Sequence, residues 1–203
     1  MEMMTIAIPT GKLYKPAVEV LKRAGMSAKG LENPGRRLIF EGDARFILVK
    51  PADVAAYVEL GAADIGIAGS DVIAESARAV CELADLGIGK CRMVMAACEP
   101  ARAVKDYDNR RVGTKYPRMA ETYFIERGMQ MEYVKLNGSV ELACVLGLTH
   151  CIVDIVETGT TLKENGLVEV ATIAQCSARL IGNRVACKYL YRQEINKLLD
   201  RLK

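Results

Sequence analysis

The sequence contains a single histidine, His150, and none of its 7 cysteines stands in a C-x-x-C pair. Structural zinc sites need thiolate or imidazole ligands clustered at short spacing, so we expect no zinc site. His150 lies beside Cys151 at the expected start of a strand and has no further triad partner nearby in the sequence. We therefore expect a structural histidine, and cysteines that are reduced and mostly buried.

The sequence has only a small excess of positive over negative charge. Lys plus Arg number 28 and Asp plus Glu number 25, a net charge of +3, which does not indicate nucleic-acid binding by charge alone. The uncharged stretch at residues 142–153 is far shorter than the ~20 residues of a membrane-spanning helix. Glu2 and Pro9 are both out of place in a signal peptide. We expect a soluble, cytoplasmic protein with no membrane and no nucleic-acid partner.

The 203 residues are 51% hydrophobic, enough for a sizeable core in one large domain or two small ones. Short apolar runs alternate with amphipathic segments, which is typical of an α/β fold with partly parallel strands. The runs predict strands at residues 5–8, 37–40, 45–49, 64–68, 93–97, 111–114, 131–136, 151–156 and 168–174. Helices are predicted at residues 13–24, 51–60, 117–127, 140–146 and 183–203, shorter ones after Ser70-Asp71 and after Thr161, and a polar loop at 101–109.

The sharpest local pattern is the turn E-T-G-T-T at residues 157–161, between a buried strand and a short helix. N–H groups at the start of a helix carry partial positive charge and bind phosphate. Gly159 lets a ligand approach the backbone closely. Further donors would be the hydroxyls of Thr158, Thr160 and Thr161. The plain alternative is an ordinary capped helix that binds no ligand.

Two carboxylates stand at the end of the same strand, Asp154 and Glu157. The carboxyl ends of strands are where α/β sheets bind ligands. Carboxylates at that edge can accept hydrogen bonds from ribose hydroxyls or hold Mg²⁺. The pattern therefore favours a ligand site at this strand end over a plain capped helix.

Further turns between strands and helices carry residues suited to an anionic or polar ligand. Lys12 and Lys115 would supply cations, and the small residues at 69–71 would leave backbone groups open to a cleft. In each turn the plain alternative is a tight turn or a helix cap, for instance at Ser139. The candidates are Gly11, Lys12, Lys50, Gly69, Ser70, Asp71, Lys115 and Glu141.

Together these segments resemble the short form of ATP phosphoribosyltransferase, the first enzyme of histidine biosynthesis. The resemblance spans nearly the whole chain and rests on IAIPTGKLYKPAVEVLKRAG, LVKPADVAAYVELGAADIGIAGSDVIAES, VGTKYPRMAETYF and KLNGSVELACVLGLTHCIVDIVETGTTLKENGL. The last stretch contains the loop that binds phosphoribosyl pyrophosphate in this family. The chain departs from the family pattern at Lys12 and Lys50, where arginine is frequent. Lysine keeps the charge but not the bidentate geometry toward phosphate.

The resemblance implies a two-lobed α/β fold like that of type II periplasmic binding proteins, with the substrate cleft between the lobes. Lobe I would comprise residues 1–90 and 178–203, and lobe II, residues 91–177, would carry the phosphoribosyl pyrophosphate loop. The implied reaction transfers the 5-phosphoribosyl group to N1 of ATP and releases pyrophosphate, with Mg²⁺ required.

The resemblance also implies roles for the candidate residues. The catalytic residues would be Asp154, Glu157 and Lys12, and residues 157–161 would bind phosphoribosyl pyrophosphate. Mg²⁺ would bind through Asp154 or through the substrate phosphates alone. ATP or the cleft would be contacted by Gly11, Lys12, Lys50, Gly69, Ser70, Asp71, Lys115 and Glu141.

The family also has a long form, with an extra C-terminal domain that binds histidine. The sequence ends at Lys203, directly after its last amphipathic segment, so the resemblance implies the short form. Short-form chains pair with a separate regulatory subunit that is similar to a histidyl-tRNA synthetase. We therefore expect a homodimer of catalytic chains that joins such subunits in a hetero-oligomer.

Two other functions stay open at the level of sequence. Phosphoribosyltransferases that act on a free nucleobase usually carry two adjacent acids before the Thr-Gly loop, whereas Ile155 and Val156 separate the acids here. A non-catalytic binding protein of the periplasmic type would bind the ligands without releasing pyrophosphate. Lys12 and the absence of an expected signal sequence argue against it.

Overall fold

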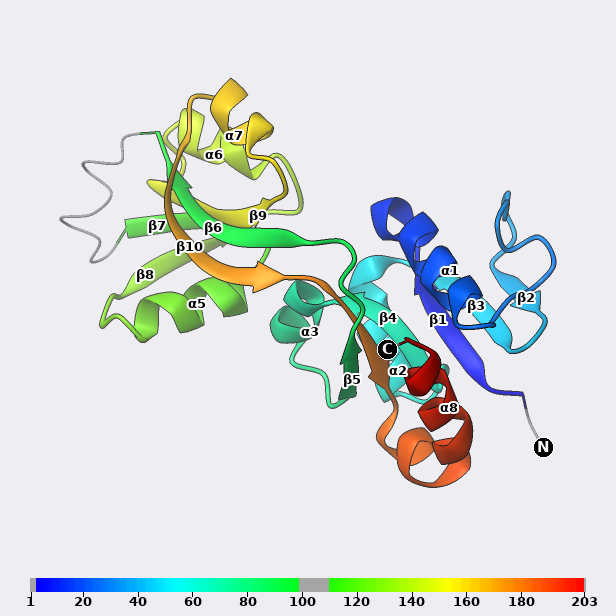
Figure 1. The fold of residues 1–203 in the computed structure, drawn as a ribbon. Helices are drawn as coiled ribbons and strands as arrows, with labels where there is room; N and C mark the ends of the chain where they lie inside the picture. The colour runs from blue at the N-terminus through cyan, green and yellow to red at the C-terminus, as the bar shows by residue number, and fades with distance from the viewer. Residues whose placement is uncertain (1–2, 99–109, 203) are drawn as a thin grey trace. The chain divides into compact units, whose positions relative to one another are not determined.

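The computed structural model describes residues 3–98 and 110–202 (Figure 1). The loop expected at 101–109 lies outside these residues. The chain divides into two compact units. Unit 1 comprises Met1–Gly89 and Ser177–Lys203, and unit 2 comprises Lys90–Cys176. The chain therefore leaves unit 1 once and returns to it once.

Unit 1 is built on a six-stranded sheet with the strand order β2-β3-β1-β4-β11-β5. β1 is parallel to both β3 and β4, whereas β2, β11 and β5 pair antiparallel with their neighbours. The strands are β1 Thr5–Pro9, β2 Ile39–Glu41, β3 Arg45–Val49, β4 Ile65–Gly69, β5 Cys81–Asp85 and β11 Ala178–Gly182.

Helices cover both faces of this sheet, because successive side chains of a strand point to opposite faces. Ile6 and Ile8 of β1 share a core with α1 and α8, while Ala7 packs with α2 on the other face. Short 3-10 turns at Gly11–Leu13 and Pro51–Asp53 lead into the first two helices. The helices are α1 Tyr14–Arg23, α2 Val54–Glu59, α3 Ser70–Ser76 and α8 Arg192–Leu202.

Unit 2 is built on a five-stranded sheet with the order β10-β6-β9-β7-β8. β7 is parallel to β8 and β9, whereas β6 is antiparallel to β9 and β10. Met93 and Met95 of β6 face α5, and Val94 and Ala96 share a core with α6 and α7. The elements are β6 Cys91–Ala97, β7 Arg110–Thr114, α5 Pro117–Ile125, β8 Met131–Lys135, α6 Val140–Val145, β9 Cys151–Val156, α7 Thr160–Glu164 and β10 Val168–Cys176.

The two crossings between the units run beside each other at both of their ends. In unit 1, Ala178 N–H donates to the Ile88 carbonyl at 2.9 Å, and Leu86 N–H donates to the Ala178 carbonyl at 2.9 Å. In unit 2, Cys91 at the start of β6 lies opposite Cys176 at the end of β10. The two segments that connect the units are therefore neighbours both where they leave unit 1 and where they join unit 2.

The expected α/β class is confirmed, and the expected strands and helices outside 101–109 are found, with two differences. β5 and β11 were not predicted, because each is a five-residue strand without a clear period and takes its place only by pairing within the sheet. The helix predicted at 183–203 is wrong as a single element, because a π-type turn at Ala186–Leu190 and a separate helix at Arg192–Leu202 take its place.

The C-terminal segment is broken at Tyr191. The Asn183 side chain accepts hydrogen bonds from the N–H groups of Val185 and Ala186, and a π-type turn follows at Ala186–Leu190. Tyr191 then leaves helical geometry with φ −126°. The amphipathic pattern nevertheless holds, because Ile195 and Leu198 of α8 are buried in the core of unit 1.

Candidate active site

The ends of the parallel strands in unit 2 carry the candidate residues predicted from the second half of the sequence. β8, β7 and β9 are parallel neighbours, with Val112 opposite both Tyr133 and Cys151. Their carboxyl ends therefore lie along one edge of the sheet, the edge at which α/β sheets bind ligands. The candidates that follow these ends are Lys115 after β7, Glu141 in α6 after β8, and residues 157–161 after β9.

The turn after β9 combines a glycine of positive φ with three exposed threonines. Gly159 has φ +86°, a conformation in which a β-carbon is strained, and α7 begins at the next residue. The hydroxyls of Thr158 and Thr160 lie 3.0 Å apart. Thr158, Thr160 and Thr161 are exposed, so their hydroxyls are open to a ligand.

Asp154, in the last part of β9, has a raised pKa. Burial raises its pKa, the charge of Glu141 acts in the same direction, and the hydrogen bond from Ile155 N–H at 2.8 Å and the charge of Lys115 oppose the rise. These interactions bring together candidates from β9, α6 and the turn after β7. The sequence placed them in three separate turns, and the structure makes them one electrostatic group.

Thr114, at the end of β7, was missed by sequence reasoning. It is fully buried; its hydroxyl donates to the Val153 carbonyl at 2.6 Å and accepts the Tyr116 N–H at 2.8 Å. The hydroxyl thus fixes the turn that carries Lys115 against the strand that carries Asp154. Only its place in a strand-to-helix turn could have suggested this role.

Arg92, near the start of β6, was also missed. Its guanidinium pairs with the Glu169 carboxylate at 2.8 Å, and Nη1 donates a longer hydrogen bond of 3.4 Å to the Glu157 carbonyl. The hydrogen bond from Arg92 lowers the pKa of Glu169. Because the contact to Glu157 joins residues 65 positions apart, no local pattern indicates it.

The candidates in the first half of the sequence follow the parallel strands of unit 1. Pro9 at the end of β1 lies opposite Val49 at the end of β3, and Thr10 N–H donates to the Val49 carbonyl at 2.8 Å. Gly11 and Lys12 follow β1, Lys50 follows β3, and Gly69, Ser70 and Asp71 join β4 to α3. Both lysine side chains are exposed.

The expected helix caps are not found. Neither α3 nor α6 has a side-chain cap hydrogen bond; Ser139 sits at the cap position with φ 48°. Ser70 instead accepts the Ser177 N–H at 3.3 Å. Asp71 is only 7% exposed, and its carboxylate covers the space that a side chain at Gly69 would need.

In residues 3–98 and 110–202 no group of three or more His, Cys, Asp or Glu side chains could hold a metal ion. None of the seven cysteines, all of which lie within the described residues, forms a disulfide; three of them are buried and four are half-buried. His150 accepts the Arg111 N–H on Nδ1 at 3.1 Å, which is a structural contact.

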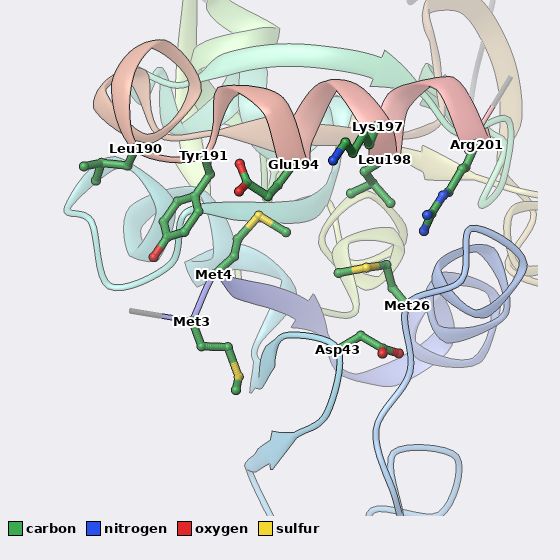
Figure 2. A pocket seen from close by; sticks show the side chains of 10 residues that line it. All are labelled: Met3, Met4, Met26, Asp43, Leu190, Tyr191, Glu194, Lys197, Leu198 and Arg201. Carbon is green, nitrogen blue, oxygen red and sulfur yellow. The ribbon is translucent and has the colours of Figure 1, made fainter. Parts of the chain in front are cut away.

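A pocket of about 550 Å³ in unit 1 is lined by none of the candidates (Figure 2). It is bounded by Met3 and Met4 before β1 and by Tyr191 and Leu198 of the C-terminal segment. Gly11 and Lys12 follow the opposite end of the same strand. The strand ends, rather than this cavity, therefore form the candidate site, because ligands of α/β sheets bind at carboxyl ends.

Among the described residues, every helix is too short or too polar to span a membrane.

The family model of ATP phosphoribosyltransferase matches residues 50–203. An ATP phosphoribosyltransferase of Moorella thermoacetica is 46% identical over 99% of this chain and 92% of its own length. An ATP phosphoribosyltransferase of Geobacillus kaustophilus is 47% identical over 98% of this chain and 97% of its own length.

Among solved structures, the chain is similar to one in the ATP phosphoribosyl transferase (HisG:HisZ) complex of Thermotoga maritima. The TM-score is 0.85 at 32% sequence identity, covering 98% of this chain and 96% of the other. The fold and the sequence therefore lead to the same family.

Proposed function

This chain belongs to the ATP phosphoribosyltransferase family, and on that premise we propose how its strand-end loops carry out the reaction. The reaction transfers the 5-phosphoribosyl group of phosphoribosyl pyrophosphate to N1 of ATP and is the first step of histidine biosynthesis. A bond forms between C1 of the ribose and N1 of the adenine, and the bond from C1 to pyrophosphate breaks. The observation that carries this function is the identity of 46–47% to named relatives over nearly the whole chain.

In the proposal, unit 2 holds the sugar phosphate. The hydroxyls and N–H groups of Thr158, Thr160 and Thr161 bind the 5-phosphate. Asp154 and Glu157 accept hydrogen bonds from the ribose hydroxyls. Support comes from the exposed threonines and the positive φ of Gly159 at the carboxyl end of β9.

Unit 1 contributes cations and backbone groups to ATP and to the departing pyrophosphate. The proposed contacts are Gly11 and Lys12 after β1, Lys50 after β3, and Gly69, Ser70 and Asp71 at the end of β4; Lys115 and Glu141 of unit 2 complete them. The two units correspond to the expected lobe I (1–90 and 178–203) and lobe II (91–177), and each lobe contributes contacts to the substrates. This reading is supported by the candidates' position after parallel strands in each unit.

The chemistry needs no covalent nucleophile. The ribose develops oxocarbenium character while negative charge builds on the pyrophosphate, so positioned cations and oriented substrates lower the barrier. Asp154 and Glu157 stabilise the ribosyl group, and Lys12 neutralises the leaving group. Lysine does so as a point charge rather than a bidentate donor.

Mg²⁺ is the cofactor of the proposal. The site residues fit an ion held mainly by substrate, because Mg²⁺ commonly binds one or two carboxylates together with substrate phosphates. Asp154, with Glu141 near it, offers such oxygen donors. When bound, the ion would neutralise phosphate charge and strengthen pyrophosphate as a leaving group.

The proposed partners follow the family's short form. Catalytic chains would form a homodimer that joins a regulatory subunit similar to a histidyl-tRNA synthetase. The similar solved structure is a HisG:HisZ complex, which supports a hetero-oligomer. A cytoplasmic location is part of the same proposal, and cell fractionation would test it.

The test is release of pyrophosphate from ATP and phosphoribosyl pyrophosphate in the presence of Mg²⁺, measured for the chain alone and with the regulatory subunit. We expect phosphoribosyl-ATP as the product. Adenine, guanine and uracil serve as alternative acceptors. Turnover with a free base but not with ATP would indicate a nucleobase phosphoribosyltransferase. Binding without release by both preparations would indicate a binding protein.

A further inference from the structure

Arg92 reaches the phosphate loop because of the strand directions in unit 2. β6 runs antiparallel to β9, so its first residues lie beside the carboxyl end of β9, and Arg92 is opposite Val156. Side-chain alternation puts Arg92 on the same face as Val94 and Ala96. That face is the one packed against α6 and α7. The side chain therefore lies on the side of the sheet that carries the loop.

The guanidinium is oriented by Glu169 of β10. Nε lies 3.2 Å from each carboxylate oxygen and Nη2 lies 2.8 Å from Oε2. Thr172 donates to the same carboxylate at 2.9 Å. Because Nε and Nη2 both bind the carboxylate, the plane of the guanidinium is fixed. The remaining nitrogen, Nη1, then donates to the Glu157 carbonyl at 3.4 Å.

Arg92 also lies near the loop two residues further along. A β-carbon added at position 159 would lie 3.7 Å from Arg92 Nη2, so the guanidinium lies near Gly159. Arg92 thus donates to the loop at Glu157 and lies near it at Gly159. The hydrogen bond to Glu157 fixes the direction in which that carbonyl points.

The orientation of one peptide group follows from this hydrogen bond. In a planar trans peptide the carbonyl and the next N–H point in opposite directions. With the Glu157 carbonyl turned toward Arg92, the Thr158 N–H points away from it. We propose that Arg92, oriented by Glu169, is a positioning residue that presents the Thr158 N–H to the 5-phosphate of phosphoribosyl pyrophosphate. This inference rests on the proposed role of residues 157–161.

The test compares phosphoribosyl pyrophosphate affinity with stability, measured by calorimetry and by urea unfolding of the full chain with Mg²⁺. The double variant Arg92→Met/Glu169→Met removes the pair without leaving an unpaired charge. We expect near-normal stability but a Kd raised about tenfold, roughly the effect of one hydrogen bond to a charged group. In steady-state assays KM for phosphoribosyl pyrophosphate should rise, while kcat and KM for ATP stay close to wild type.

Arg92→Lys separates geometry from charge, because lysine keeps the positive charge and loses the fork. We expect weakened binding in this variant as well. Arg78→Met is the matched control, since Arg78 forms a 2.8 Å ion pair with Glu59 in unit 1; it should leave the Kd unchanged. A wild-type Kd in the double variant, or in Arg92→Lys, would overturn the proposal.

Thr161→Val separates this proposal from the function on which it rests. If Thr161→Val raises the Kd and the Arg92 variants do not, the loop binds the phosphate and Arg92 has no positioning role. If neither change raises the Kd, residues 157–161 do not bind the substrate and the proposed function of the loop fails.

Discussion

Asp154→Asn should weaken catalysis and strengthen the fold at the same time. Burial raises the pKa of Asp154 from its ordinary value of 3.8. A carboxyl with a higher pKa in the folded than in the unfolded chain binds more protons when folded, so the free energy of unfolding falls as pH rises between the two pKa values. The ionised carboxylate is therefore a cost to the folded chain at neutral pH.

The amide removes that ionisation while it can still accept the hydrogen bond from Ile155 N–H. Well below pH 3.8 the variant and the wild type should be similarly stable, since the carboxyl is then protonated in both the folded and the unfolded chain. With rising pH the variant should become the more stable, and the difference should level off above the raised pKa. Urea unfolding at several pH values measures this curve.

Turnover should change in the opposite direction. Loss of the carboxylate at the ribose should lower kcat by more than tenfold, which corresponds to about 1.4 kcal/mol of transition-state stabilisation. Pyrophosphate release is followed across a Mg²⁺ titration. Glu132→Gln is the matched control, because Glu132 is exposed within β8, and it should leave both quantities near wild type.

Two results would refute the reasoning. Near-normal turnover of Asp154→Asn at every Mg²⁺ concentration would remove Asp154 from the catalytic group. Lower stability than wild type at neutral pH would mean that the hydrogen bond and the Lys115 charge outweigh burial in setting the pKa.

Thr161→Val should raise the Kd for phosphoribosyl pyrophosphate by at least tenfold with unchanged unfolding, because a hydrogen bond to a charged group contributes about 1.5–3 kcal/mol; an unchanged Kd would exclude this hydroxyl. Thr114→Val should destabilise the chain by about 1–3 kcal/mol, since it leaves the buried Tyr116 N–H without its acceptor, and a wild-type urea midpoint would contradict that. Histidine should not bind the isolated chain in calorimetry, because allostery needs a second site and we assign that site to the regulatory subunit. Micromolar histidine binding away from the strand ends would disprove the two-subunit hypothesis.

The local patterns of the sequence predicted most of the elements and the strand-end turns. Each turn is contiguous, so E-T-G-T-T at 157–161 could be assigned to a strand, a glycine turn and a helix start without knowing the sheet order. The sequence alone does not show which of these turns lie close to one another in the folded chain. Only the parallel pairing of β8, β7 and β9 brings Lys115, Glu141 and Asp154 to one edge.

What the sequence could not supply depends on distant partners. Arg92 and Thr114 act through residues 65 and 39 positions away, and β11 has a place only between β4 and β5. The break at Tyr191 lies within an amphipathic pattern that continues across it. Periodicity reports which face is buried and not whether the backbone stays helical, so a single helix was predicted there.

The paired crossings make unit 2 an insertion in the strict sense of chain topology. Ile88 and Ala178 are joined by a backbone hydrogen bond, so a linker of a few residues could rejoin unit 1 after removal of the inserted segment, at little entropic cost for closing so short a loop. Cys91 and Cys176 are neighbours too, so the excised segment would begin and end at one point. Both junctions between the units therefore lie close together, so we expect that unit 2 can be replaced by the corresponding segment of a relative.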